Sequence, residues 1–204
     1  MRKIDNVIVG SYENNCYIIR DEASSTCVLV DPGSEAQRIL AKTRELGLTI
    51  EAILLTHGHF DHVLAVKEIA EATSCPIWMH PGDHHPASGA MIDFFYPLSK
   101  EDLPNIQYCN DADVLNLAGL TIQVLATPGH TEGSVCYRFE DILITGDTLF
   151  AGSIGRTDLP GGSYQTIQDS LSRLVALEEN YRIFPGHGES SDLATEKRSN
   201  PYLR

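Results

Sequence analysis

The segment Thr56-His57-Gly58-His59-Phe60-Asp61-His62 decides how the rest of this chain is interpreted. It follows Ile53-Leu54-Leu55, a short apolar run typical of a buried strand, so the histidines begin where that strand ends. Side chains alternate along an extended segment, which places His57 and His59 on one side, where the two imidazoles can share a metal ion. If the chain turns into a helix near Asp61, then Asp61 and His62 leave that side and can reach a second ion. One short loop therefore offers two pairs of ligands.

A simpler interpretation is that Asp61 caps a helix beginning at Val63 and that the histidines are surface residues. Three histidines and one aspartate lie within the six positions 57–62, however. Imidazole and carboxylate are both ligands of zinc and related divalent metals. We therefore interpret the segment as metal-binding.

Three later apolar runs are each followed by a histidine or an aspartate, the residue types found in the segment 57–62. Residues 122–125 lead to Pro128-Gly129-His130, residues 142–144 lead to Gly146-Asp147, and residues 182–184 lead to Pro185-Gly186-His187. If these turns lie at one edge of the fold, seven ligands converge: His57, His59, Asp61, His62, His130, Asp147 and His187. Zinc commonly takes four ligands, so seven are better used by two ions that share one carboxylate and one hydroxide.

The pattern of apolar runs predicts two similar halves. The first half has expected strands at 6–9, 16–19 and 27–30 in an antiparallel meander, helices at 35–46 and 63–73, and strands at 53–55 and 76–79. The second half has expected strands at 114–117, 121–125, 135–139, 142–145 and 181–184 and a helix at 164–177. Two sheet-plus-helix halves bury their sheets most economically against each other. The expected fold class is therefore α/β (α+β), a four-layer αββα sandwich.

Composition limits the class of protein. The 204 residues contain no linker-like segment, so a single domain over 1–204 is expected. Fifteen Lys and Arg against 28 Asp and Glu give a net charge of −13, which argues against nucleic-acid binding. No apolar run is long enough to cross a bilayer, and no apolar segment follows the first residues, so a cytoplasmic protein without membrane contact is expected. The five cysteines have no C-x-x-C spacing and are expected to be reduced core thiols.

The segment 81–110 is rich in proline and aromatic residues and is too long for an ordinary connection. It contains Phe94-Phe95-Tyr96 and is interpreted either as an element that covers the substrate or as a loop packed on the core. Nearby His80, His84 and His85 have no paired ligand spacing and are expected at the surface. Arg156 and Asp158 offer either contacts to substrate or an ion pair that holds the loop, and the ion pair is expected.

Together, the segment 56–62, Pro-Gly-His130, Gly146-Asp147 and Pro-Gly-His187 resemble the motifs of the metallo-β-lactamase superfamily, in order and over nearly the whole chain. The resemblance implies a first metal held by His57, His59 and His130 and a second held by Asp61, His62 and His187. Asp147 would bridge the two. Asn15-Cys16-Tyr17 and Val30-Asp31-Pro32-Gly33 also resemble this superfamily, in which that aspartate supports the site from behind.

The run from Gly146 to Asp158 and the end Arg198-Ser199-Asn200-Pro201-Tyr202-Leu203 are similar to the glyoxalase II (hydroxyacylglutathione hydrolase) branch and its short bacterial relatives. Full-length glyoxalase II carries a further helical domain that holds glutathione, whereas only residues 188–204 follow His187 here. Asp147 argues against a true class B β-lactamase, in which the matching position is typically cysteine or is not a ligand.

The resemblance implies metal-dependent hydrolysis of a small-molecule thioester. Asp61, besides binding metal, would orient the attacking hydroxide and accept its proton. Nitrogen and oxygen ligands suit two divalent ions, zinc first, and would also admit iron or manganese. The main alternative is a persulfide dioxygenase of the same superfamily, with one iron at His57, His130 and Asp147, because Gly155-Arg156-Thr157-Asp158 resembles that branch. A lactonase and a non-catalytic metal-binding protein are the remaining alternatives.

Overall fold

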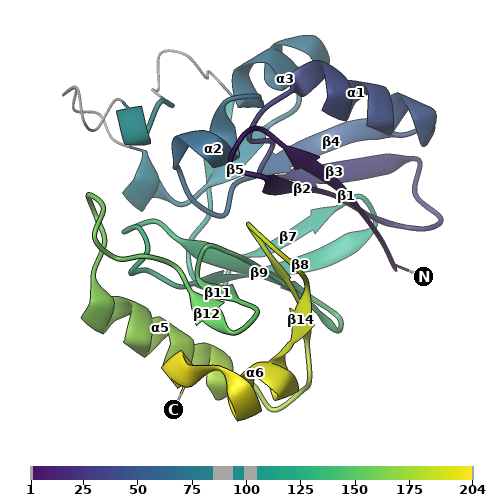
Figure 1. The fold of residues 1–204 in the computed structure, drawn as a ribbon. Coiled ribbons are helices and arrows are strands. Elements are labelled where there is room, and N and C mark those ends of the chain that lie inside the picture. The colour runs from purple at the N-terminus through teal and green to yellow at the C-terminus, as the bar shows by residue number, and fades with distance from the viewer. Residues whose placement is uncertain (1, 85–93, 99–104, 204) are drawn as a thin grey trace.

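A computed structural model describes residues 2–84, 94–98 and 105–203 of the chain (Figure 1). Its first sheet has six strands in chain order: β1 (Arg2–Val9), β2 (Asn14–Asp21), β3 (Thr26–Val30), β4 (Thr49–Leu54), β5 (Ile77–Met79) and β6 (Ile106–Tyr108). β1, β2 and β3 pair antiparallel, which confirms the predicted meander. From β3 to β6 the pairs are parallel, since α1 (Ala36–Glu45) and α3 (Val66–Thr73) provide two of the crossover connections that parallel strands require.

The second sheet also has six strands, in the order β14 (Ser191–Asp192), β13 (Arg182–Pro185), β10 (Ile142–Gly146), β9 (Val135–Phe139), β8 (Leu120–Ala126) and β7 (Val114–Leu117). A short hairpin of β11 (Leu149–Phe150) and β12 (Ser153–Ile154) follows β10. Helix α5 (Tyr164–Val175) then crosses to β13, which pairs parallel with β10. Its first turn is capped by the Ser163 side chain, which accepts a hydrogen bond from the Thr166 amide.

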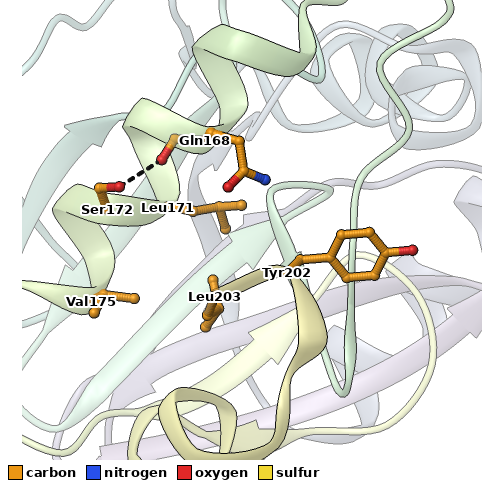
Figure 2. A pocket seen from close by; sticks show the side chains of 6 residues that line it. All are labelled: Gln168, Leu171, Ser172, Val175, Tyr202 and Leu203. Atoms are coloured by element: carbon orange, nitrogen blue, oxygen red, sulfur yellow. Dashed lines mark hydrogen bonds between the residues drawn. The ribbon is translucent and has the colours of Figure 1, made fainter.

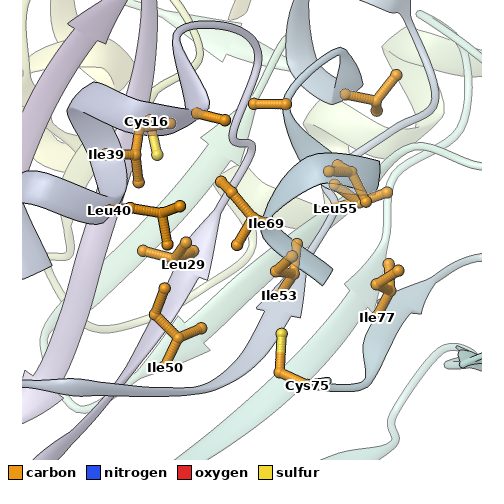
Figure 3. Packing of buried hydrophobic residues seen from close by; sticks show 14 of the residues in the cluster. Cys16, Leu29, Ile39, Leu40, Ile50, Ile53, Leu55, Ile69, Cys75 and Ile77 are labelled. Atoms are coloured by element: carbon orange, nitrogen blue, oxygen red, sulfur yellow. The ribbon is translucent and has the colours of Figure 1, made fainter. Parts of the chain in front are cut away.

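The layers are held together by three apolar clusters. α1 and α3 cover the outer face of the first sheet, and α5 and α6 (Leu193–Ser199) lie on the far side of the second (Figure 1). Figure 3 shows the outer cluster, in which Ile39 and Ile69 of the helices pack on Leu29 and Ile53 of the strands. Each buried side chain of this size contributes ~1.5–3 kcal/mol.

Neighbouring strand residues alternate between the outer clusters and the interior. Ile18 and Ile53 face the helices, whereas Ile19 and Leu54 face the second sheet and join a cluster that contains Tyr137 and Ile144. A third cluster joins α5 to the outer face of the second sheet. The four-layer αββα arrangement predicted from the sequence is therefore confirmed.

The helix predicted at 63–73 is wrong at its beginning. The chain forms a short α2 (Phe60–Val63), breaks at residues 64–65, and continues as α3. At the break, the Ala65 amide donates to the Pro32 carbonyl, 3.1 Å away on the turn after β3. Gly33 of that turn lies so close to α2 that a Cβ on it would sit 1.7 Å from the Asp61 carbonyl oxygen. The contact with this turn separates the two helices.

Other predictions have clear outcomes. All five cysteines are free and buried, as expected. β6, β14, α6 and the β11–β12 hairpin were not predicted. Within the described residues, no helix combines the length and apolar character that a bilayer crossing needs.

Candidate metal centre

The seven predicted ligands lie at the ends of strands or in the short helix that follows one of them. His57 comes just after β4, and His59 is the extended residue before α2, which contains Asp61 and His62. His130 lies in the turn between β8 and β9, Asp147 directly follows β10, and His187 follows β13. Because β10 and β13 are parallel neighbours, their carboxyl ends meet at one edge of the sheet. The fold thus brings these residues together.

His57, His59 and His130 form the first group, with one ligand atom of each within 4.8 Å of the others. All three are buried, at 2–3% exposed. His59 Nδ1 lies 2.9 Å from His130 Nε2, and the rings of His57 and His59 are 4.8 Å apart. Four ligands around a metal at ~2.0–2.1 Å are separated by about 3.3 Å, so this spacing is close to that of a metal site.

Asp61, His62 and His187 form the second group. His62 Nε2 lies 3.2 Å from His187 Nε2, which lies 3.3 Å from Asp61 Oδ2. His62 is fully buried, whereas the side chains of Asp61 and His187 are 17% and 26% exposed. The second group therefore opens further toward solvent than the first.

Asp147 lies between the two groups. Its Oδ2 is 3.7 Å from His130 Nε2 in the first group and 3.6 Å from His187 Nε2 in the second. Its Oδ1 is 3.5 Å from His62 Nε2. One carboxylate thus reaches ligands of both groups, which is the geometry that a bridging ligand requires.

Four of the five histidines use Nδ1 for contacts with oxygen acceptors and direct Nε2 inward. Nδ1 of His130 and His187 lies 2.7 and 2.9 Å from the backbone carbonyl oxygens of Arg156 and Tyr12. Nδ1 of His62 lies 3.0 Å from Asp31 Oδ2, and Nδ1 of His57 lies 3.1 Å from Thr56 Oγ1. Outward hydrogen bonds of this kind fix the tautomer with its Nε2 lone pair available to a metal.

Buried polar atoms that lack a hydrogen-bond partner agree with this inward orientation of the ligand atoms. Across the part of the chain that the structure describes, buried His57 Nε2 and Asp147 Oδ1 have no hydrogen-bond partner. Buried polar atoms normally have one, so these two atoms are available as ligands of a metal. The donor set and its geometry fit a metal site.

Asp31 stabilises the centre from behind. Its two oxygens accept hydrogen bonds from the amide and hydroxyl of Thr56, at 2.7 and 2.6 Å, and one of them also contacts His62. One ligand atom from each of Asp31, His57 and His62 also lies within 4.8 Å of the other two. The Asp31 oxygens are already occupied by these donors, so we assign Asp31 the supporting role that the sequence resemblance implies.

The two groups differ electrostatically. Burial, together with the charges of neighbouring histidines, lowers the pKa of His59 to about 3 and holds the pKa of His57 well below its usual range. Burial also disfavours charged His62, but the Asp147 carboxylate and the hydrogen bond to Asp31 outweigh it and raise the pKa of His62 to about 9. The second group therefore attracts positive charge, and a bound cation would supply it.

A pocket of about 460 Å³ opens over the centre. His59, Asp61, His130, Asp147 and His187 form its floor, and Tyr12, Phe60, Phe94, Phe95, Arg156 and Leu159 line its sides. Three ring contacts at 5.2 Å connect Tyr12, Phe60, Phe94 and Phe95 into one aromatic wall. A second pocket, between α5 and the C-terminal residues Tyr202 and Leu203, has no carboxylate, imidazole or thiol in its lining (Figure 2). The first pocket is therefore the candidate active site.

The profile of the family described as the metallo-beta-lactamase superfamily matches residues 9–187, which include all seven ligand candidates. The chain belongs to the metallo-beta-lactamase superfamily. Within this superfamily, a Haemophilus influenzae protein named hydroxyacylglutathione hydrolase GloC is 33% identical over 210 residues, covering 98% of this chain and 97% of that protein. YqgX of Bacillus subtilis, a probable metallo-hydrolase, is 36% identical over 201 residues, covering 96% of this chain and 94% of that protein.

Solved structures of the superfamily are also similar. BLEG-1, described as a B3 metallo-beta-lactamase, gives a TM-score of 0.86 at 31% identity over 100% of this chain and 99% of that one. ETHE1 from Myxococcus xanthus gives a TM-score of 0.83 at 31% identity, over 98% of this chain and 83% of that one. TTHA1623, in a di-iron-bound form, gives a TM-score of 0.82 at 35% identity, over 98% of this chain and 100% of that one.

The structure also places residues that the sequence left open. Arg156 and Asp158 form the expected two-bonded ion pair, at 2.7 and 2.8 Å, although Arg156 also lines the pocket. His84 is buried beside the Tyr108 hydroxyl, so its expected surface position is wrong, because β6 brings Tyr108 over it. His85 lies outside the described residues. None of His80, His84 and Arg156 belongs to the three ligand groups found among the described residues.

The Pro-Gly turn before His187 packs tightly behind the second group, as a glycine at this position permits. A Cβ on Gly186 would lie 2.3 Å from Asp147 Oδ1 and 2.6 Å from His62 Cε1. We therefore expect Gly186→Ala to displace both ligands and to weaken metal binding by the second group by about tenfold to a hundredfold, as changes behind metal ligands do. Metal titration of the metal-free variant measures this.

A matched control is Gly47→Ala, in which the added Cβ meets nothing within 4 Å although φ is +68°. It should lower stability by about 1 kcal/mol through backbone strain without changing metal binding. Equal metal affinities in Gly186→Ala and the parent would contradict the predicted packing.

Proposed function

We propose that this protein is a metal-dependent hydrolase of thioesters, of glyoxalase II type, acting on S-lactoylglutathione or a related hydroxyacyl thioester. The observation that carries the proposal is the pair of ligand groups joined by Asp147 at the floor of one open pocket. The name of the GloC relative, and its similarity along nearly the full length of both chains, support the same activity.

The proposed cofactor is a pair of divalent ions, zinc first, with His57, His59 and His130 holding one and Asp61, His62 and His187 the other. Nitrogen and oxygen ligands without sulfur also accept iron or manganese, and the di-iron form of TTHA1623 is consistent with iron in a related chain. When bound, such ions lower the pKa of a coordinated water from ~15.7 toward ~7 and polarise a carbonyl group.

The chain's own groups orient the reactants. Asp61 lies in the pocket floor, and its pKa is about 2, since the hydrogen bond with His187 and the charge of His62 outweigh the opposing effect of burial. An ionised Asp61 accepts a hydrogen bond from the attacking water and takes up its proton as the water adds to the thioester carbonyl. The leaving thiolate is stable enough to depart with little acid assistance.

A persulfide dioxygenase is the second candidate. His57, His130 and Asp147 are adjacent, and Asp147 Oδ2 lies 3.7 Å from His130 Nε2, so the three residues expected for a single iron are also assembled. The Gly155–Asp158 run resembles that branch. Counting and identifying the metals per chain, together with oxygen consumption in the presence of glutathione persulfide, separates the two activities.

The lining of the pocket predicts weak selection of the thiol part of the substrate. Arg156 is the only cation in the lining as described, and its guanidinium is already paired with Asp158. Two further cations, Lys197 and Arg198 of α6, do not line the pocket; Lys197 donates to the Leu177 carbonyl and Arg198 to Thr195. A chain of charge −13 also steers an anionic substrate poorly.

We therefore expect kcat/KM for thioesters of glutathione, coenzyme A and simple alkyl thiols to agree within about a hundredfold, with high KM for glutathione thioesters. Steady-state kinetics with the same acyl group on each thiol measures this. A β-lactam should react more slowly than any of these, because its amine leaves less readily than a thiolate. A preference for glutathione above about a hundredfold, equal to ~2.7 kcal/mol at 1.36 kcal/mol per tenfold, would contradict weak selection.

A further inference from the structure

Asp83 lies between the two loops that provide the first ligand group. It ends the short 3-10 helix η1 (Pro81–Asp83) after β5 and is 1% exposed. It is absent from the pocket lining and from the three metal groups among the described residues. The proposed mechanism therefore leaves this buried carboxylate unused.

The Asp83 carboxylate connects loops from different halves of the molecule. Its Oδ2 accepts hydrogen bonds from the Gly58 amide at 2.8 Å and from the Thr131 hydroxyl at 2.6 Å, and its Oδ1 accepts one from the Gly133 amide at 2.7 Å. Gly58 separates His57 from His59, and Thr131 directly follows His130. The three described donors thus converge on one carboxylate, and hydrogen bonds to a carboxylate are stronger than those between neutral groups.

Glycines make this close approach feasible. A Cβ on Gly133 would lie 2.5 Å from the Asp83 amide nitrogen and 2.7 Å from Oδ1, and a Cβ on Gly58 would lie 3.0 Å from the Asp83 Cβ. A Cβ on Gly82 would lie 3.0 Å from the Gly133 backbone. The Thr131 hydroxyl is further held by Ser134 Oγ at 2.7 Å. Both packing and hydrogen bonds therefore fix the carboxylate between the loops.

We propose that Asp83 is a positioning residue that sets the distance between residues 57–59 and residues 130–133 and thereby the metal affinity of the first group. This inference rests on the metal-binding part of the proposed function. The loops come from separate sheets, and the first group needs His59 Nδ1 and His130 Nε2 near their present separation of 2.9 Å. The bond from the Val135 amide to the Thr56 carbonyl joins the same loops on the strand side, and Asp83 joins them on the side of the histidines.

Asp83→Asn tests the inference because it keeps the size of the side chain and replaces one acceptor oxygen with a donor that faces other donors. The metal-free variant is titrated with Zn²⁺ in competition with a chromogenic chelator. His59→Ala and His187→Ala identify which binding step belongs to which group. We expect the affinity of the first group to fall about tenfold to a hundredfold, the range for changes behind metal ligands, while the second group changes less than about twofold.

Glu196→Gln is the matched control. Glu196 is 2% exposed and accepts hydrogen bonds from the Gly152 amide, Ser191 and Asn200, but it bonds neither histidine loop. It should leave the ratio of the two affinities unchanged even if the thermal unfolding temperature falls. This control separates a local effect on one group from a general loss of stability.

Thr131→Val and Thr131→Ser provide a second test if Asp83→Asn does not fold. Valine removes one of the three donors and should lower the affinity of the first group several-fold, whereas serine keeps the hydroxyl and should restore it. Equal affinities in the variants and the parent, or equal losses at both groups, would overturn the inference. The titration uses no thioester, so an inactive parent enzyme would refute the proposed reaction and leave this test intact.

Discussion

Asp147→Ala is expected to lower the metal content of both ligand groups and to reduce kcat/KM for thioester hydrolysis at least about a thousandfold, equal to ~4 kcal/mol of transition-state stabilisation. The reason is the position of the carboxylate, 3.7 Å from His130 in the first group and 3.6 Å from His187 in the second. Removing it takes one ligand from each ion and leaves the remaining imidazoles without a compensating negative charge. Elemental analysis of the purified variant, followed by steady-state kinetics, measures both effects.

The control for this substitution is Asp141→Ala. Asp141 is an exposed aspartate that pairs with Arg182 at 2.9 Å, and it belongs to none of the ligand groups. Metal content and kcat/KM should equal those of the parent. Loss of only one ion in Asp147→Ala would show that this carboxylate does not bridge, and full occupancy of both groups would remove Asp147 from the metal centre altogether.

Removal of the metals is expected to abolish hydrolysis, with at least about a thousandfold loss of kcat/KM, and two equivalents of a divalent cation per chain should restore it. The pocket lining as described includes no serine, threonine, cysteine or lysine that could replace the hydroxide as nucleophile. Unfolding temperature should fall as well, because a ligand present at about a thousand times its Kd stabilises the folded state by ~4.1 kcal/mol. Chelation, elemental analysis and thermal unfolding of the same preparation measure all three effects.

Two ions of zinc or another divalent metal per chain would agree with the proposed hydrolase. One iron per chain, with oxygen consumption and no thioester turnover, would instead identify the protein as the dioxygenase. Full thioester turnover by the metal-free protein would contradict both activities. A preparation with bound metal and no turnover of either substrate class would favour a non-catalytic protein.

The local pattern of the sequence was sufficient for most elements. β9 and β10 were predicted at or within one residue of their observed bounds, whereas β4, observed at Thr49–Leu54, was predicted only at its end, 53–55. β14 and α6 were missed because both elements are short. The strand has two residues, and the N-cap of the seven-residue helix is Asp192, whose side chain accepts a hydrogen bond from the Thr195 amide. That capping pattern, Asp-x-x-Thr, was the available signal.

The division of α2 from α3 illustrates a different limit. Residues 60–73 have a continuous helical pattern, and no glycine or proline lies within them. The break depends on the amide of Ala65 bonding to Pro32, 33 positions earlier, and on Gly33 packing against Asp61. The pairing of β3 with β4 brings these distant residues into contact, and local sequence patterns do not predict that pairing.

The sequence by itself determined the types of the seven ligand candidates, their place after apolar strands and the four-layer fold that gathers them. Only the tertiary structure decided the distances and the hydrogen bonds that orient each ring. His187 is held by the carbonyl of Tyr12, and the loops of the first group are joined by Asp83. Every residue has a backbone carbonyl, so residue type does not predict which carbonyl will orient a histidine. In the sequence, a buried aspartate cannot be distinguished from an exposed aspartate in a turn. Their roles therefore arise only when the two sheets pack and bring these distant segments into contact.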